Sequence, residues 1–277
     1  MKRRRSGLTL VELLVVMLIL SILTVVAVQS TDSLVDQGRY DATVKTLQAV
    51  DEAIFGPANA REPDGTVLVS GFVADIGRLP TNPQELWLQP ANVPMMALYS
   101  TTDPEVKVPC GWRSYLRMPT KSDGTPDVLR DSWANPLVFD VNTFGSLGAN
   151  GVVGGQGYDS DITRSLDPGR YVSVVNGILT LLDANGQPRD TTDTISVVLY
   201  GPPDPAGPWP ATTAPIPGKS ATVNKTGTGV YEFSVSTTIG PRLLRAYEGA
   251  VTGGKKSRVI SIAATPGPRY QPITIQP

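Results

Sequence analysis

The sequence contains no histidine, and Cys110 is its only cysteine. The absence of histidine excludes a Ser-His-Asp triad, a Cys-His pair and any His-ligated zinc or iron site. A single cysteine excludes an intrachain disulfide. Charged residues make up 18 % of the chain, and 24 Lys plus Arg do not exceed 25 Asp plus Glu. This balance argues against a nucleic-acid partner.

Glycine and proline are abundant instead, 27 and 25 residues in a chain of 277. That content suits β-rich and loop-rich folds more than helical ones. The length leaves room for two domains beyond a membrane helix.

The first 28 residues combine a basic start with a long apolar run. Four cations occupy positions 2–5, and only Glu12 is charged from Leu8 to Val28. A helix over this run is about 31 Å long, enough to cross the hydrocarbon core of a bilayer. Because the cations precede the span, residues 1–7 are expected in the cytoplasm and the rest of the chain is expected to be exported.

Three interpretations of this segment compete. It is an ordinary signal-anchor, or a cleaved secretory signal peptide whose best cleavage site, Val28-Gln-Ser30, is poor. The third is that the segment has a function beyond anchoring, and it depends on Glu12. A carboxylate at mid-membrane costs about 2.5–3.5 kcal/mol, so such a residue usually interacts with a partner.

The hexapeptide Gly7-Leu-Thr-Leu-Val-Glu12 behind a short basic leader resembles the prepilin signature of type IV pilins and type II secretion pseudopilins. The resemblance implies that a prepilin peptidase cuts between Gly7 and Leu8 and methylates the new N-terminus. It also implies that Glu12 pairs with the terminal ammonium of a neighbouring subunit. The family more often has Phe where Leu8 stands. Without the four leader cations, 20 basic residues face 25 acidic ones, a net charge near −5.

Helical character extends past the span. Five apolar residues fall on one helical stripe, and Gly56-Pro57 ends the pattern. We therefore predict one helix over residues 8–56, with 8–28 as membrane span or filament core. The stripe consists of Tyr40, Val44, Leu47, Val50 and Ile54.

Residues 57–167 are predicted to form a pilin-like α+β domain. Within it, Asp131-Ser-Trp-Ala-Asn-Pro136 resembles the Asp-Pro-Trp-Gly-Asn-Pro turn of the major pseudopilin of type II secretion, from which Ser132 and Ala134 depart.

The glycine-rich loop from Phe144 to Ile162 lacks a Lys-Ser/Thr after its glycines, so it is no phosphate-binding loop. Its carboxylates Asp159 and Asp161 and its flexible carbonyls suit Ca²⁺. The loop resembles the calcium loop of the major pseudopilin. The resemblance implies a carbonyl ligand at Leu147 and oxygen ligands at Ser146, Asp159 and Asp161, with Asn150 where relatives often have Asp. A glycine-rich loop without metal is the alternative.

In residues 168–277 the sequence pattern changes to short runs of strand-forming residues, which predict an all-β, sandwich-like domain. The predicted runs are Tyr171–Val175, Ile178–Leu182, Ile195–Tyr200, Val230–Val235, Leu243–Tyr247 and Val259–Ile262. The segment weakly resembles carboxypeptidase-regulatory or transthyretin-like domains. The resemblance to the major pseudopilin ends near residue 167.

These observations predict an α+β protein that is a filament subunit and not an enzyme. The prepilin resemblance implies a type II secretion pseudopilus or a type IV pilus-like fibre, built from the bacterial inner membrane into the periplasm or onto the cell surface. Expected partners are prepilin peptidase, further copies of the chain, other pseudopilins and an inner-membrane assembly platform. Alternatives are an adhesion, motility or minor tip pilin, and a membrane-anchored ligand-binding protein that uses Trp209.

Overall fold

The computed structural model describes residues 10–57, 60–61, 68–124, 127–203, 209 and 215–276, without the side chains of residues 25–32. The helices are α1 (Leu10–Phe55), α2 (Phe72–Ile76) and the short 3-10 helices η1 (Pro83–Leu86), η2 (Gly157–Asp159) and η3 (Pro168–Arg170). The strands are β1 (Ala97–Ser100), β2 (Lys107–Cys110), β3 (Val138–Phe139), β4 (Thr143–Ser146), β5 (Ile162–Ser165), β6 (Val172–Leu181), β7 (Ile195–Tyr200), β8 (Lys219–Ser220), β9 (Thr222–Gly227), β10 (Val230–Thr238), β11 (Gly240–Glu248), β12 (Lys255–Lys256), β13 (Ile260–Ala264), β14 (Gly267–Tyr270) and β15 (Ile273–Ile275).

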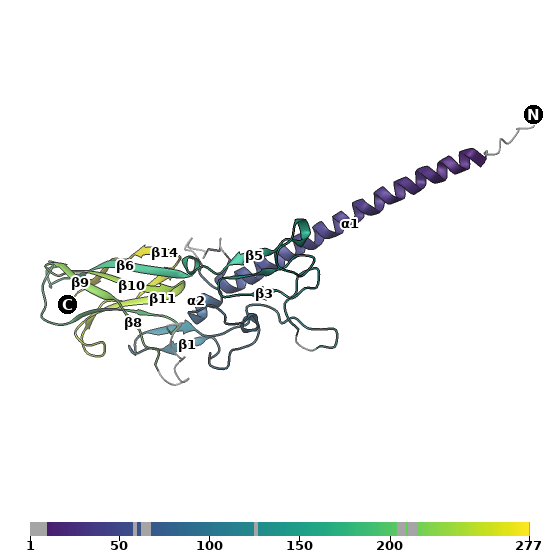
Figure 1. Ribbon diagram of the computed structural model, residues 1–277. Helices are drawn as coiled ribbons and strands as arrows, with labels where there is room; N and C mark the ends of the chain where they lie inside the picture. The colour runs from purple at the N-terminus through teal and green to yellow at the C-terminus, as the bar shows by residue number, and fades with distance from the viewer. Residues whose placement is uncertain are drawn as a thin grey trace, which may run out of the picture. The chain divides into compact units, whose positions relative to one another are not determined.

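Helix α1 is the long purple helix in Figure 1. It ends where Gly56 adopts a left-handed φ of 81° and donates its N–H to the Glu52 carbonyl at 2.8 Å. This is the usual way in which glycine caps a helix. Leu47, Val50 and Ile54 are buried, which confirms the second half of the predicted stripe.

The chain divides into two compact units. The first combines the chain up to Thr46 with residues 130–137 and 146–162, and the second combines residues 47–129, 138–145 and 163–277. The expected domain boundary after residue 167 stays a prediction. Residues 68–124 belong to the same unit as the C-terminal strands.

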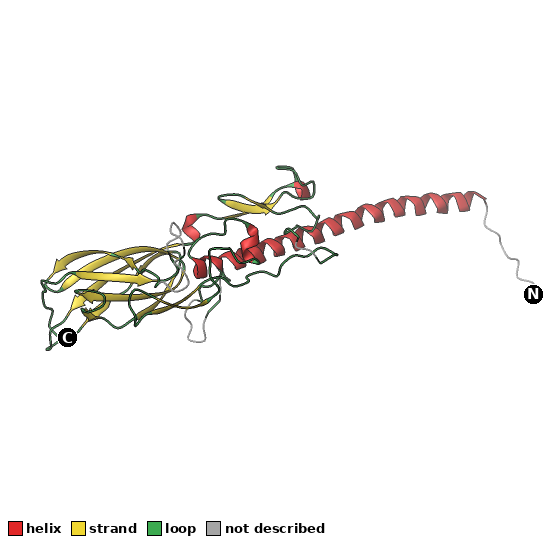
Figure 2. Ribbon diagram, turned by 90° about the horizontal axis from the view of Figure 1, so that it is seen from below, coloured by secondary structure: helices red, strands yellow, loops and turns green. Residues whose placement is uncertain are grey.

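The second unit contains two five-stranded sheets. In the β6 sheet the strand order is β14-β6-β10-β9, with β15 also paired to β6. In the β11 sheet it is β12-β11-β7-β8, with β13 also paired to β11. Figure 2 shows these strands, in yellow, as two layers. The predicted C-terminal β domain is thus confirmed.

The core between the two sheets follows from alternation along the strands. In β10, Tyr231, Phe233 and Val235 are buried while Glu232 and Ser234 are exposed, because successive side chains point to opposite faces. Buried residues from both sheets complete this core: Val175, Leu179, Leu181, Val197, Leu199, Leu244, Ala246, Ile273 and Ile275.

A third layer covers the outer face of the β11 sheet. Strands β1 and β2 form an antiparallel hairpin whose Val106, Val108 and Cys110 pack against that sheet. Burial raises the pKa of the Cys110 thiol to about 12, so it stays protonated and unreactive at neutral pH. The apolar contacts from the sheet come from Val198, Tyr200 and Tyr247.

A buried polar network lies beneath this hairpin. Asp103 is fully buried, and its Oδ2 accepts hydrogen bonds from Arg245 Nη1 at 2.9 Å and Tyr247 Oη at 2.7 Å. Tyr247 Oη also lies 2.6 Å from Tyr200 Oη. These bonds join the loop between β1 and β2 to the β11 sheet.

The sequence pattern predicted two separate strands where the structure has one. The runs at 171–175 and 178–182 belong to one continuous strand, β6. Asn176-Gly177 continues the strand pairing instead of turning. A Cβ on Gly177 would lie 1.9 Å from the Gln271 carbonyl oxygen and 2.5 Å from the Phe233 ring, so this glycine serves a close approach inside a strand.

Candidate functional site

The predicted cleavage pair, Gly7 and Leu8, lies outside the described residues. Helix α1 is described from Leu10 onward, and the large apolar side chains of its first part are all exposed. Leu10 is 79 % exposed, Met17 67 % and Leu23 58 %. Because successive helical residues point about 100° apart, these side chains cover every side of the helix. The remaining members of this apolar surface are Val11, Leu13, Leu14, Val15, Val16, Leu18, Ile19, Leu20 and Ile22.

Glu12 is the acidic residue in the first turn of α1, and it is exposed among these apolar neighbours. The first turn is where the helix dipole favours a carboxylate. Glu12 follows Leu8 by four positions, so a helix that begins at Leu8 would place both residues on one side.

No helix in the described part of the chain is both long enough and apolar enough to cross a membrane. The predicted span from Leu8 to Val28 begins before the described residues. Its insertion into a bilayer stays a prediction.

The first unit contains a turn organised by Asp131, which was predicted to begin a turn motif but not to be a site residue. Asp131 Oδ1 accepts the backbone N–H groups of Trp133 at 3.0 Å and Asn135 at 2.8 Å. Its Oδ2 accepts the Ser146 hydroxyl at 2.6 Å. An Asp that accepts N–H groups a few residues ahead is a common turn signal, and the predicted turn motif begins at this residue.

Ala134 takes a positive φ of 71° in this turn. The pseudopilin turn that this segment was expected to resemble has glycine at the position of Ala134. An L-residue in this left-handed region costs about 1–2 kcal/mol, which the Asp131 hydrogen bonds help to offset. The turn also docks on the helix, because Ser132 N donates to Thr43 Oγ1 at 3.1 Å.

The glycine-rich loop connects β4 to β5 and folds back on itself. A Cβ on Gly148 would lie 2.7 Å from the Asp159 carbonyl oxygen, and one on Gly155 would lie 2.8 Å from Asp159 Cβ. Glycine at both positions lets the two arms of the loop meet. The structure therefore brings Leu147, which precedes Gly148, to the same part of the loop as Asp159.

The predicted ligands differ in their surroundings. Ser146 is buried, and its hydroxyl is engaged by Asp131 and by Gly148 N at 3.1 Å. Asn150 Oδ1 accepts Val152 N at 2.9 Å. Both carboxylate oxygens of Asp161 accept Gly154 N at 3.1 Å, and Asp159 is exposed.

The chemistry of this donor set fits a hard cation in part. Asp159 and Asp161 could supply charge and Leu147 a carbonyl, while the Ser146 hydroxyl is already committed to shaping the loop. Across the described residues, no three His, Cys, Asp or Glu side chains gather as a metal cluster. Any cation here would therefore depend on backbone and water oxygens for most of its ligands.

The loop is fixed to α1 through Tyr158. Its hydroxyl donates to Gln37 Oε1 at 3.1 Å, and its ring lies 6.3 Å from that of Tyr40. Tyr158 thus joins the glycine-rich loop to Gln37 and Tyr40 of α1.

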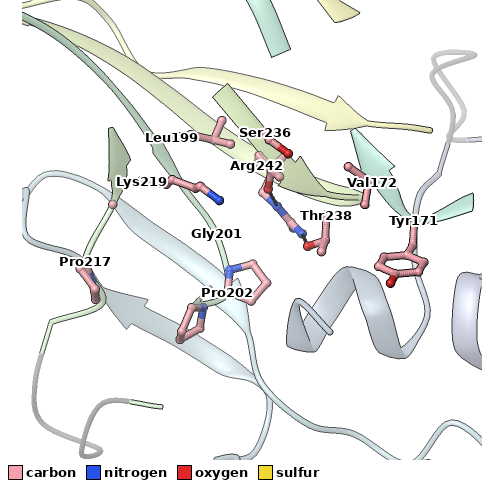
Figure 3. Close-up of a pocket in the computed structure, with 13 residues that line it drawn as sticks. Tyr171, Val172, Leu199, Gly201, Pro202, Pro217, Lys219, Ser236, Thr238 and Arg242 are labelled. Atoms are coloured by element: carbon pink, nitrogen blue, oxygen red, sulfur yellow. Dashed lines mark hydrogen bonds between the residues drawn. The ribbon is translucent and has the colours of Figure 1, made fainter. Parts of the chain in front are cut away.

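A pocket of about 350 Å³ in the second unit lies beside Arg242 (Figure 3). In the figure the guanidinium points toward Thr238, and Tyr171 lies at one end of the pocket. Burial lowers the pKa of Arg242 to about 10, which leaves it charged at neutral pH.

Arg242 is unsuited to bind a ligand in this pocket because the protein uses all five of its N–H donors. The acceptors are Thr237 Oγ1 at 3.3 Å, Ala74 O at 3.1 Å, Pro241 O at 2.9 Å, and Thr238 Oγ1 and Ile239 O at 2.8 Å each. We interpret this arginine as the group that fixes α2 to β11.

Trp209, the aromatic residue of the ligand-binding alternative, is half-buried and packs edge-on against Tyr99 with ring centroids 6.4 Å apart. Its indole therefore packs against the third layer.

The comparison with known families bears on the basic leader and the apolar start of α1. Residues 2–28 match the prokaryotic N-terminal methylation motif. This motif is the prepilin-type signal, which implies processing by a prepilin peptidase and pilin-like assembly. The methylation motif ends at residue 28, so it does not distinguish a pseudopilus from a pilus. No curated protein matches the chain.

Proposed function

We propose that this chain is the structural subunit of a type II secretion pseudopilus or a type IV pilus-like filament, assembled from the bacterial inner membrane after residues 1–7 are removed. The observation that carries the proposal is the methylation motif at residues 2–28, followed by a helix whose apolar side chains are exposed on every side. Each such side chain contributes about 1.5–3 kcal/mol when it is fully buried.

The proposed mechanism is assembly without catalysis. The N-terminal helix holds the subunit in the membrane, with the rest of the chain exported, until the assembly platform extracts it. The apolar helices of neighbouring subunits, or of other pseudopilins, then bundle and bury one another. Glu12 pairs with the methylated N-terminal ammonium of the next subunit, because a carboxylate among apolar helices needs a cation.

The filament role is tested by shearing both intact cells and spheroplasts, whose opened outer membrane exposes a periplasmic filament, and by probing the released material. We expect long fibres that contain this chain without residues 1–7. The apolar half of α1 is stable in water only when it is covered. A chain that stays wholly in the membrane fraction after shearing would contradict the proposal.

We further propose that the loop between β4 and β5 binds Ca²⁺ through Asp159, Asp161 and the Leu147 carbonyl. Support comes from the two carboxylates and from the close approach of the loop's arms at Gly148 and Gly155. Ordering a glycine-rich segment costs conformational entropy. The free energy of binding an ion to the loop would offset that cost.

Calcium is therefore expected to raise the melting temperature of the detergent-solubilised chain. At a calcium concentration about 100 times the Kd, the stabilisation is about 2.7 kcal/mol. Asp161→Ala should abolish this increment, and Asp193→Ala, an exposed carboxylate outside the loop, should preserve it. Identical melting curves in calcium and in chelator would show that the loop binds no metal.

A minor tip or adhesion pilin is the second candidate, favoured by the two-sheet sandwich with its own core. Such a subunit would be present in few copies per cell and a major one in thousands, so quantitative mass spectrometry separates them. A mature chain that keeps residues 1–7 would instead favour a membrane-anchored ligand-binding protein.

A further inference from the structure

The outer face of the β6 sheet carries a hollow that the filament role does not use. Its volume is about 310 Å³ and its lining comes from β6, β9, β10 and β14. Pockets of this size take small ligands when a few polar groups are well placed on a partly apolar surface. The hollow lies entirely within the second unit.

Strand register places the lining side chains in two rows. Residues directly opposite one another on paired strands point to the same face of a sheet. The first row crosses four strands and consists of Tyr270, Asn176, Ser234 and Thr222. The second row, two residues further along β6, consists of Ile178, Glu232 and Asn224.

These side chains form a surface with an aromatic end and a polar centre. Tyr270 is 64 % exposed, and Ile178 supplies an apolar patch in the second row. Because strands lie about 4.8 Å apart, the four-strand row extends about 14 Å. The hollow therefore runs across the strands rather than along them.

The polar groups of the hollow are available to a ligand. Within the described residues, the side chains of Asn176, Asn224 and Glu232 make no hydrogen bond or ion pair with the protein. Together they offer amide donors, amide acceptors and a carboxylate acceptor. A planar amide or carboxylate can bond two neighbouring hydroxyl groups at once.

The composition of the lining selects the class of ligand. It contains no Lys or Arg, which argues against phosphate, sulfate or nucleic acid. Its single carboxylate is too little for a metal ion. An added peptide strand would pair at a sheet edge, and this hollow lies on a face.

We propose that this face binds a neutral glycan chain. A sugar ring presents apolar C–H groups on its flat side, which suit the exposed Tyr270 ring, and hydroxyl groups around its rim. Those hydroxyls donate to Glu232 and exchange hydrogen bonds with Asn176 and Asn224. The chain of sugars lies across the strands, with Ser234 and Thr222 at the end away from Tyr270. The site does not depend on filament assembly.

The test uses the full chain in detergent with cellulose, chitin and a mannan as probes. We expect co-sedimentation with at least one of them, followed by calorimetry with its soluble oligosaccharide. Tyr270→Ala should weaken the affinity about tenfold, the loss expected for one aromatic contact. Asn224→Ala and Glu232→Gln test the polar centre separately.

Leu98→Ala is the matched control, because Leu98 is 68 % exposed on β1, away from the hollow. It should bind like the unaltered chain. All four changes are at exposed side chains, and equal melting temperatures establish that the variants are folded. Failure to bind any of the three glycans overturns the proposal. So does binding that survives in all three site variants, or stronger binding to dextran sulfate than to a neutral glycan.

Discussion

Replacing Glu12 by leucine is expected to abolish filaments while leaving leader cleavage intact. The cleavage site precedes Glu12, and the substitution makes the apolar run continuous, so membrane insertion should be preserved or improved. Inside a bundle of apolar helices, however, the N-terminal ammonium of the neighbouring subunit would lose its counter-charge. Breaking a buried ion pair in this way costs about 3–5 kcal/mol, which lowers an association constant more than a hundredfold.

Glu52→Leu is the matched control for this change. Glu52 lies on the same helix and is exposed, but it belongs to the polar half and accepts a hydrogen bond from Gln48 Nε2. Sheared fractions and electron micrographs should show normal fibres for Glu52→Leu and none for Glu12→Leu. Abundant normal fibres from cells carrying Glu12→Leu would remove Glu12 from the assembly mechanism.

Asp103→Asn is expected to destabilise the second unit by about 3 kcal/mol or more, because it removes one charge of a buried pair. The asparagine keeps the size of the side chain but cannot neutralise Arg245, whose Nη1 lies 2.9 Å from Oδ2. Tyr247 would also lose a charged acceptor. Urea unfolding, followed by tryptophan fluorescence, measures the difference.

The neighbouring Glu105 is the control. Its side chain is 60 % exposed, although it lies 2.8 Å from Arg245 Nη2, so Glu105→Gln should have a much smaller effect. Equal destabilisation by the two substitutions would show that burial of Asp103 does not govern the network.

The effect of Asp103 should depend on pH. Burial alone would raise the pKa of Asp103, but hydrogen bonds from Tyr247 and the Glu105 N–H, with the charges of Arg245 and Lys256, lower it below its ordinary value. Its stabilisation is therefore complete above the unfolded pKa of about 3.9 and is lost as the pH falls through the lower folded value. The difference in the free energy of unfolding between the unaltered chain and Asp103→Asn should therefore become smaller in acid.

The long helix and the sandwich could be predicted because periodicity reports burial directly. The stripe through Leu47, Val50 and Ile54 and the alternation through Tyr231, Phe233 and Val235 both appear as buried faces. The continuous strand β6 could not be predicted. Asn-Gly usually signals a turn, and only tertiary contacts at Phe233 and Gln271 explain a glycine inside this strand.

The polar sites were harder to predict than the core, because hydrogen bonds between distant segments have no sequence period. Asp131 and Ser146 are 15 positions apart, and Asp103 and Arg245 are 142 apart. The packing of the β1–β2 hairpin shows the same limit. The β1–β2 hairpin packs on a sheet whose strands begin more than 80 positions later, a pairing that no local pattern announces.

The mature N-terminus tests the central claim most directly. An intact-mass measurement of the chain purified from bacterial membranes, with fragmentation of its N-terminal peptide, identifies the first residue and its modification. We predict a chain that begins at Leu8, lacks the four leader cations and carries one N-methyl group, as the methylation motif over residues 2–28 implies. A chain that keeps its leader, or one that begins near Thr31 after signal-peptide cleavage, would contradict the account.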